Sequence, residues 1–273
     1  MSLDNPAARL LAILENGLEL QDEMNCRKAW CKLLSVEAGK NAILMGRIGK
    51  VMSLSTDILE SLNNIGGVKV DRYLHWVNPV EQAFIKNNLN GQWSAFKGQI
   101  NEHVINYLSM TSDLLSHKCA EPVLSESSLS SILKNARNLI DEVRNSDLPS
   151  EIKNFMVKHL HKVCLAVEEH SICGTESVSS AVESAFGFGV LHGESVELAK
   201  TNSTAQKFWQ QMANVALIIS ISTGVQQLAP PIMELLPEIS FEESAIKKET
   251  EVQDSNERNN SSQQDASKAG TSA

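Results

Sequence analysis

The sequence predicts an all-α protein, and three observations carry this prediction. Apolar residues recur at intervals of three and four along almost the whole chain, which is the spacing of one face of a helix. No run alternates apolar and polar residues for long enough to form a strand, apart from the short segment 68–70. The chain also begins with a helix start, because Asn5 suits the cap position and Pro6 the first helical position. We therefore expect a multi-helix bundle.

Residues 1–66 are predicted to form an N-terminal module of small helices. Its apolar stripes cover residues 10–18, 26–34, 44–52 and 58–62, and the last of these is a short helix of its own. The turn around Gly66 and Gly67 closes the module.

Residues 67–236 are predicted to form the helical bundle. Pro79 should start or kink a helix, and a stripe from Trp93 to Leu115 predicts one long amphipathic helix. Further helices are expected over 129–143 and 152–167, and two more flank residues 199–208. The last of them is a hydrophobic helix over 208–229.

Residues 237–273 are predicted to be a disordered acidic and polar tail. The segment is rich in Glu, Ser, Asn and Gln and poor in apolar residues. Such a segment cannot bury enough surface to offset the loss of chain entropy on folding.

Composition limits the function classes and the compartment. The formal net charge is −9, which argues against attraction of the whole chain to nucleic acid. The 5 cysteines are odd in number and irregularly spaced, which is typical of free thiols in a reducing compartment. The N-terminus has no basic run before an apolar core, so it does not resemble a secretory signal. We expect a cytoplasmic body.

The candidate chemistry does not name a reaction. His161 with Cys164, and His170 with Cys173, have the three-residue spacing of helical metal ligands. However, His161 falls opposite the apolar stripe, and structural zinc sites favour tighter cysteine pairs, so surface histidines and buried thiols are the preferred interpretation. Cys173 could be a nucleophile, but a buried structural cysteine is favoured. Gly187 to Gly189 lacks the third glycine and the strand of a dinucleotide site. We therefore predict no catalytic residue, no metal ligand, no cofactor and no enzyme activity.

A basic cluster in the N-terminal module is the candidate surface for a partner. It includes Lys40, has only Glu37 as an acidic neighbour, and contributes five candidate contact residues: Arg27, Lys28, Lys32, Arg47 and Lys50. Two short helices joined by a short turn are also found in helix-turn-helix proteins. A solvated polar face that binds nothing is the simplest interpretation, and a nucleic-acid partner is disfavoured; if the face does bind, protein and RNA are as open as DNA.

The N-terminal half resembles a helical module of poorly characterised bacterial proteins, some of which belong to anti-phage defence neighbourhoods. The stretches that carry the resemblance are DNPAARLLAILENG, NCRKAWCKLL, LMGRIGKVMSL, LNGQW and HVINYL. The resemblance implies a bacterial origin and a role in defence. It implies no mechanism and no catalytic residues.

The longest apolar stretch, Met212 to Val225, permits two interpretations. Its strongly apolar part is short for a membrane span, and polar residues interrupt it. Flanking aromatics such as Trp209 suit a membrane interface. Small residues recur every four positions here and in the preceding helix, which lets two helices approach closely. The candidate membrane or helix-packing residues are Ala181, Ala185, Gly189, Gly193, Trp209, Ala216, Ser220 and Gly224.

The sequence therefore supports two function hypotheses. The first is a defence- or stress-related effector whose C-terminal hydrophobic helices, through 208–229, associate with or insert into the inner membrane. The alternative is a soluble helical adaptor or regulator that binds a protein or nucleic-acid partner through its basic N-terminal module. Membrane lipid and a second copy of the chain are the other candidate partners.

Overall fold

The structure is a computed structural model that describes residues 3–119 and 121–223. The chain divides into two units, Met1–Leu235 and Leu236–Ala273, and all described residues belong to the first. The predicted tail over 237–273 lies outside the described residues. So do Gly224 and the end of the predicted helix 208–229.

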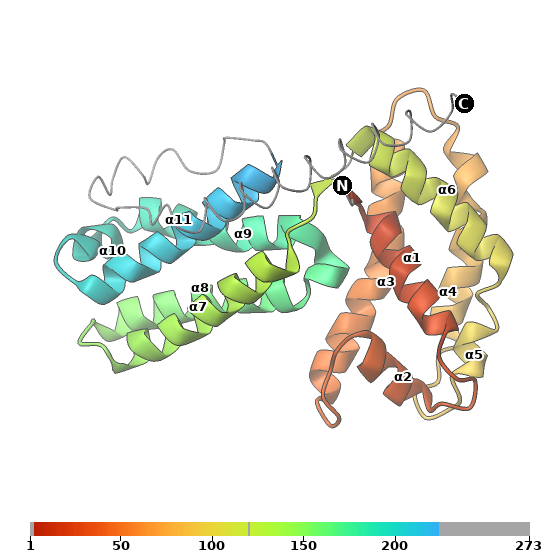
Figure 1. Ribbon diagram of the computed structural model, residues 1–273, viewed down its shortest axis with the longest axis horizontal. Helices are drawn as coiled ribbons and strands as arrows, with labels where there is room; N and C mark the ends of the chain where they lie inside the picture. Colours follow the sequence, from red (N-terminus) through yellow and green to blue (C-terminus); the bar gives the residue numbers. More distant parts are fainter. Residues whose placement is uncertain (1–2, 120, 224–273) are drawn as a thin grey trace, which may run out of the picture. The chain divides into compact units, whose positions relative to one another are not determined.

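The fold is all-α, as predicted (Figure 1). Its β structure among the described residues is the antiparallel pairing of β1 (Leu3–Asp4) with β2 (Glu121–Pro122) and an isolated bridge between Asn25 and Gln92. Between the two strand segments β1 and β2, the chain forms α1 (Pro6–Leu18), α2 (Cys26–Leu33), α3 (Asn41–Asn63), the 3-10 helix η1 (Val70–Trp76), α4 (Val77–Ile85), α5 (Ser94–Lys97) and α6 (Glu102–Cys119). The second strand segment is followed by α7 (Glu126–Asn145), α8 (Ser150–Glu168), α9 (His170–Leu191), α10 (Glu194–Glu197), the 3-10 helix η2 (Leu198–Lys200) and α11 (Ser203–Thr223).

The start of α1 follows the predicted capping chemistry. Oδ1 of Asn5 accepts a hydrogen bond from the backbone N–H of Ala8 at 2.9 Å, and Pro6 begins the helix. Nδ2 of the same side chain donates to the backbone oxygen of Ser112 at 3.2 Å. One buried asparagine therefore both caps α1 and ties it to α6.

Two helix boundaries differ from the prediction. The stripes over 44–52 and 58–62 belong to one helix, α3, because Leu54 and Ser55 between them are also buried and continue the same face. The long helix expected from Trp93 to Leu115 is broken into α5 and α6. Gly98 ends α5, and the side chain of Asn101 accepts from the N–H of Val104 at 3.0 Å, which caps α6.

The first six α-helices share one hydrophobic core, so the predicted domain boundary at residue 66 falls inside it. Buried side chains from Ala7 to Leu115 form one cluster that also takes in Ile172 of α9. An aromatic group lies within it, where the rings of Trp30 and Trp93 meet edge to face with centroids 5.2 Å apart. Phe84 and Phe96 complete this group.

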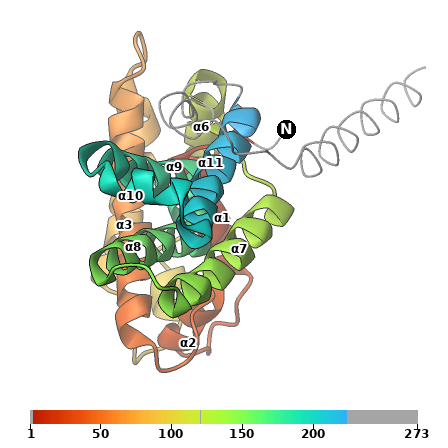
Figure 2. The same cartoon turned by 90° about the vertical axis from the view of Figure 1, so that its left-hand side faces the viewer.

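Helices α7, α8, α9 and α11 pack together as a second group (Figure 2). α8 lies against both α7 and α9, and α11 covers α7 and α9. The face of α11 that meets them is apolar and buried, and consists of Phe208, Trp209, Met212, Val215, Ala216 and Ile219. α9 also contacts α1 and α3, which joins the two groups of helices.

Candidate functional site: charged groups on α2 and α3

The five basic residues of the predicted partner surface divide into two sets. Arg27, Lys28 and Lys32 lie on α2, and the two lysines face solvent. Arg47 and Lys50 lie on α3 and contact acidic residues elsewhere in the chain. The structure therefore does not gather the five side chains on one surface.

α2 presents its basic face outward because its other face is fixed in the core. Ala29 and Trp30 are fully buried, and the backbone N–H of Cys26 donates to the oxygen of Gly91 at 2.9 Å. On the opposite side, the guanidinium of Arg27 donates to Oδ1 of Asn41 at 2.7 Å, which holds the start of α2 against the start of α3. Among residues 3–119 and 121–223, neither Lys28 nor Lys32 has a carboxylate partner.

Arg47 is buried, with a side chain that is 6% exposed, and its donors are occupied inside the chain. One terminal nitrogen donates to the backbone oxygens of Leu34 at 2.8 Å and Ser35 at 3.3 Å, in the turn that ends α2. Nε donates to Glu169 at 3.3 Å, and the other terminal nitrogen reaches Glu168 at 3.4 Å. The prediction that Arg47 is available to a partner is therefore corrected by this burial.

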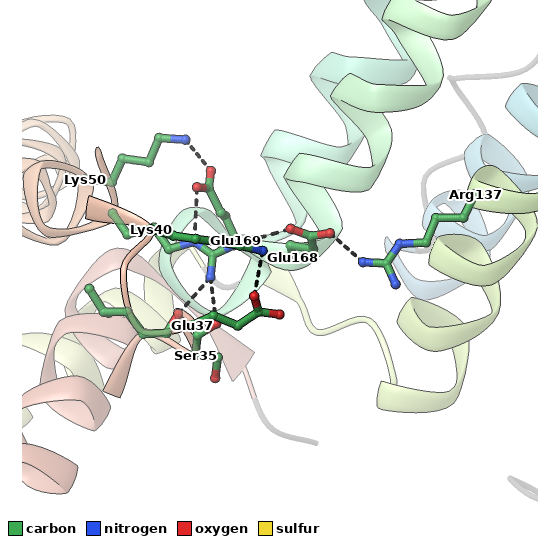
Figure 3. A network of polar contacts seen from close by, with 9 residues as sticks. Ser35, Glu37, Lys40, Lys50, Arg137, Glu168 and Glu169 are labelled. Carbon is green, nitrogen blue, oxygen red and sulfur yellow. Dashed lines mark hydrogen bonds and ion pairs between the residues drawn. The ribbon is translucent and has the colours of Figure 1, made fainter. Parts of the chain in front are cut away.

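Glu168, the last residue of α8, and Glu169, which follows it, extend the network to a second residue of α3 and to α7 (Figure 3). Glu169, also 6% exposed at its side chain, accepts from Lys50 of α3. Glu168 accepts from Arg137 of α7 at 2.7 Å. Because a buried carboxylate needs a partner, this network holds α3 against the junction of α8 and α9.

Two sequence signals could have revealed the position of Arg47. It lies three residues after Leu44 and four before Val51, so it falls on the buried stripe of α3. The adjacent acids Glu168 and Glu169 end an otherwise apolar helical stripe. Since arginine is rarely buried without a partner, this pattern indicates an internal ion pair.

The thiols and histidines do not assemble into a reactive or metal-binding site. Within the described part of the chain, no group of three or more His, Cys, Asp and Glu residues could hold a metal ion. Burial raises the pKa of the Cys173 thiol above its usual range, and this opposes formation of the nucleophilic thiolate. His161 is exposed beside Arg144, whereas His170 is buried with its ring nitrogen 3.2 Å from the hydroxyl of Thr175.

The small residues of α9 and α11 pack inside the bundle. Ala181, Ala185, Gly189 and Ala216 are buried, and Gly189 lies against the ring of Trp209. Trp209 is fully buried and donates its indole N–H to the oxygen of Ser195 at 3.1 Å, a helix-packing position instead of a membrane interface. The hydroxyl of Ser220 donates to the oxygen of Ala216 at 2.8 Å. Gly193, by contrast, is exposed between α9 and α10 and meets no other helix, so it takes no part in this packing.

The apolar stretch itself is helical as far as Thr223, and its inner face is buried as far as Ile219. Met212 and Val215 are fully buried against other helices. In residues 3–119 and 121–223, no helix combines the length and apolar character that crossing a bilayer requires.

Comparison with known proteins gives no assignment. A scan against protein-family models, a search of curated proteins and a search of solved structures each found no match.

Proposed function

We propose that this chain is a non-catalytic helical adaptor that binds an acidic protein partner through the exposed face of α2. The observation that carries the proposal is the pair Lys28 and Lys32. They face solvent four residues apart on one short helix, and no carboxylate among the described residues compensates them. Like charges at this spacing destabilise a helix by about 0.2–0.5 kcal/mol. Carboxylates of a partner would remove that repulsion.

Apolar surface next to these cations supports a protein partner. Arg27 contacts Asn41, so the basic face of α2 meets the start of α3. One turn after Asn41, on the same side of α3, Met45 is 53% exposed. Protein interfaces combine an apolar centre with a polar rim, and methionine adapts well to different partner surfaces.

The small number of free cations on α2 favours a protein partner over a nucleic-acid partner. Arg47 and Lys50, which would have widened the basic surface, are engaged by Glu168 and Glu169. What remains on α2 is too small for the row of phosphate contacts that nucleic-acid affinity needs, in a chain of net charge −9.

The proposal predicts a salt-sensitive interaction that a double charge reversal abolishes. The test captures proteins from the native host on immobilised full-length chain at low and high salt. Lys28→Glu with Lys32→Glu should lose the partner that the wild type binds at low salt. The matched control is Lys134→Glu with Lys158→Glu, two exposed lysines on α7 and α8 that should leave binding unchanged. An identical set of captured proteins for wild type and the α2 variant, with equal melting temperatures, would contradict the proposal.

The other expectations of the sequence stay predictions. A role in bacterial defence depends on the resemblance of the N-terminal half, and it would make the partner a component of such a system. No feature of the described residues favours membrane insertion, so fractionation of cells followed by carbonate extraction remains its direct test.

A further inference from the structure

A polar groove lies between α7 and α11, apart from the surface on α2. Its volume is ≈ 240 Å³. The side chains that line it are mostly carboxamides: Asn135 and Asn138 from α7, and Gln210, Gln211 and Asn214 from α11, with Leu139 between the helices. Glu142 and Lys207 also line the groove and form an ion pair of 2.6 Å that connects α7 to α11.

Gln211 is the buried polar group of this groove. It is 9% exposed, and its carboxamide has no hydrogen-bond partner among residues 3–119 and 121–223. Asn135, Asn138 and Asn214 are likewise without a partner in the described part of the chain. Asn135 and Asn138 are exposed and the amide atoms of Gln211 keep contact with solvent in the groove, so these carboxamides are available to a ligand that supplies both donors and acceptors.

We propose that the groove binds an extended polypeptide segment with small, uncharged polar side chains. A peptide unit presents one N–H and one C=O, and a carboxamide offers the complementary acceptor and donor. The lining residues recur at helical intervals from Asn135 to Glu142 and from Lys207 to Asn214. Each span rises about 10 Å along its helix. Three residues of extended chain cover the same length.

Other ligand classes fit the lining less well. No aromatic side chain lines the groove, so it offers no platform for stacking a nucleobase. The ion pair of Glu142 with Lys207 leaves no uncompensated charge in the lining, so neither a phosphate nor a carboxylate finds a counter-charge there.

The test uses the full-length chain labelled with nitrogen-15 and the capped tripeptide acetyl-Asn-Ser-Gln-amide as probe. Titration should shift the side-chain NH₂ signals of Gln211 and Asn214 in a saturable way. Gln211→Met should weaken binding about tenfold, the effect of losing two neutral hydrogen bonds. The matched control is Gln206→Met, which removes an exposed carboxamide of α11 outside the groove and should leave affinity unchanged.

Three outcomes would overturn the proposal. One is the absence of any saturable change in the side-chain NH₂ signals at peptide concentrations up to the millimolar range, which would mean that the groove holds only water. Another is equal affinity in Gln211→Met and the wild type, provided that both have the same circular dichroism spectrum. The third is tighter binding of adenosine, which would make the groove a base site. Because α2 contributes nothing to this groove, these results are independent of the charge reversal on α2.

Discussion

Gly189 of α9 lies directly beneath the indole of Trp209 of α11. A methyl group on its Cα would lie 3.0 Å from Cζ2 of that ring and closer still to Cη2. Trp209 is fully buried and hydrogen-bonded to the backbone, so the ring has no free space into which to move. The absence of a side chain at residue 189 is therefore a condition for packing α9 against α11.

Gly189→Ala should lower the free energy of unfolding by about 1–3 kcal/mol, the usual effect of overpacking a core. Gly187→Ala is the matched control in the same helix. A methyl group there meets nothing within 4 Å, so the gain in helix propensity should stabilise the chain by about 0.5–1 kcal/mol. Urea denaturation of both variants measures the difference. Equal stability changes at the two positions would contradict the close approach.

The sequence predicted this close approach but not the residue that makes it. The four-residue interval of small side chains indicated a face where another helix comes near, and Ala181, Ala185 and Gly189 are indeed buried. The interval suggests small residues on both helices, whereas the structure places an aromatic ring against Gly189. The identity of the neighbour depends on the relative shift and rotation of the two helices, and periodicity within each helix does not fix these.

The basic residues of α2 and α3 also show that local sequence does not predict which side chains interact. Proximity in the sequence grouped Arg27 with Arg47, although one contacts Asn41 and the other contacts Glu169, 122 residues further along the chain. Local spacing places Arg47 on the buried face of α3, but it does not identify a partner so far along the chain. Local rules did predict the cap of α1 and the all-α class, because capping and periodicity act within a few residues.

Replacement of Arg47 should leave a buried carboxylate short of a partner. Arg47→Met should lower the free energy of unfolding by about 3 kcal/mol, at the lower end for a broken buried pair because Lys50 still contacts Glu169. Adding Glu169→Gln removes the orphaned charge and should restore at least half of that loss. The control is Lys40→Met, whose pair with Glu37 is exposed and screened by solvent, so its loss should leave stability almost unchanged. If the double variant is less stable than Arg47→Met, the charge of Glu169 is not what is destabilising.

His159 should make stability depend on pH below neutrality. Burial against the aromatic rings of Phe155 and Phe188 lowers its pKa from 6.5 to about 4. In the unfolded chain the imidazole takes up a proton as the pH falls through 6.5, whereas in the folded chain it stays neutral until about 4. Acidification therefore favours the unfolded state, and between pH 7 and pH 5 this histidine should remove about 2 kcal/mol of stability.

His159→Leu should flatten that pH dependence. Because Nδ1 of His159 is buried and has no partner within the described residues, the variant should also be at least as stable as the wild type at pH 7. His161→Leu is the control on the same helix. That imidazole is exposed, so this variant should keep the slope of the wild type. The measurement is urea denaturation at pH 7, 6 and 5, and an unchanged slope in His159→Leu would contradict the assignment.

Gly174 combines a glycine-only backbone conformation with a crowded position. Its φ of 72° and ψ of −174° interrupt α9 near its start, in a region that residues with a side chain rarely adopt. A methyl group there would also lie 2.8 Å from Cζ of Arg9 and 2.8 Å from Oδ2 of Asp4. Those two side chains form a partly buried ion pair of 2.7 Å that a new methyl group would displace.

Gly174→Ala should therefore lower the free energy of unfolding by about 3 kcal/mol, from backbone strain and steric overlap together. Gly39→Ala separates the two causes, because Gly39 has a φ of 91° but nothing within 4 Å of the added methyl group. It should show the strain alone, about 1 kcal/mol. Shortening the neighbour with Arg9→Ala in the Gly174→Ala background should then relieve the overlap, so the second change should cost less there than in the wild type. Additive losses in this double-mutant cycle would mean that Gly174 is required only for its backbone conformation and not for the space that it leaves to Arg9.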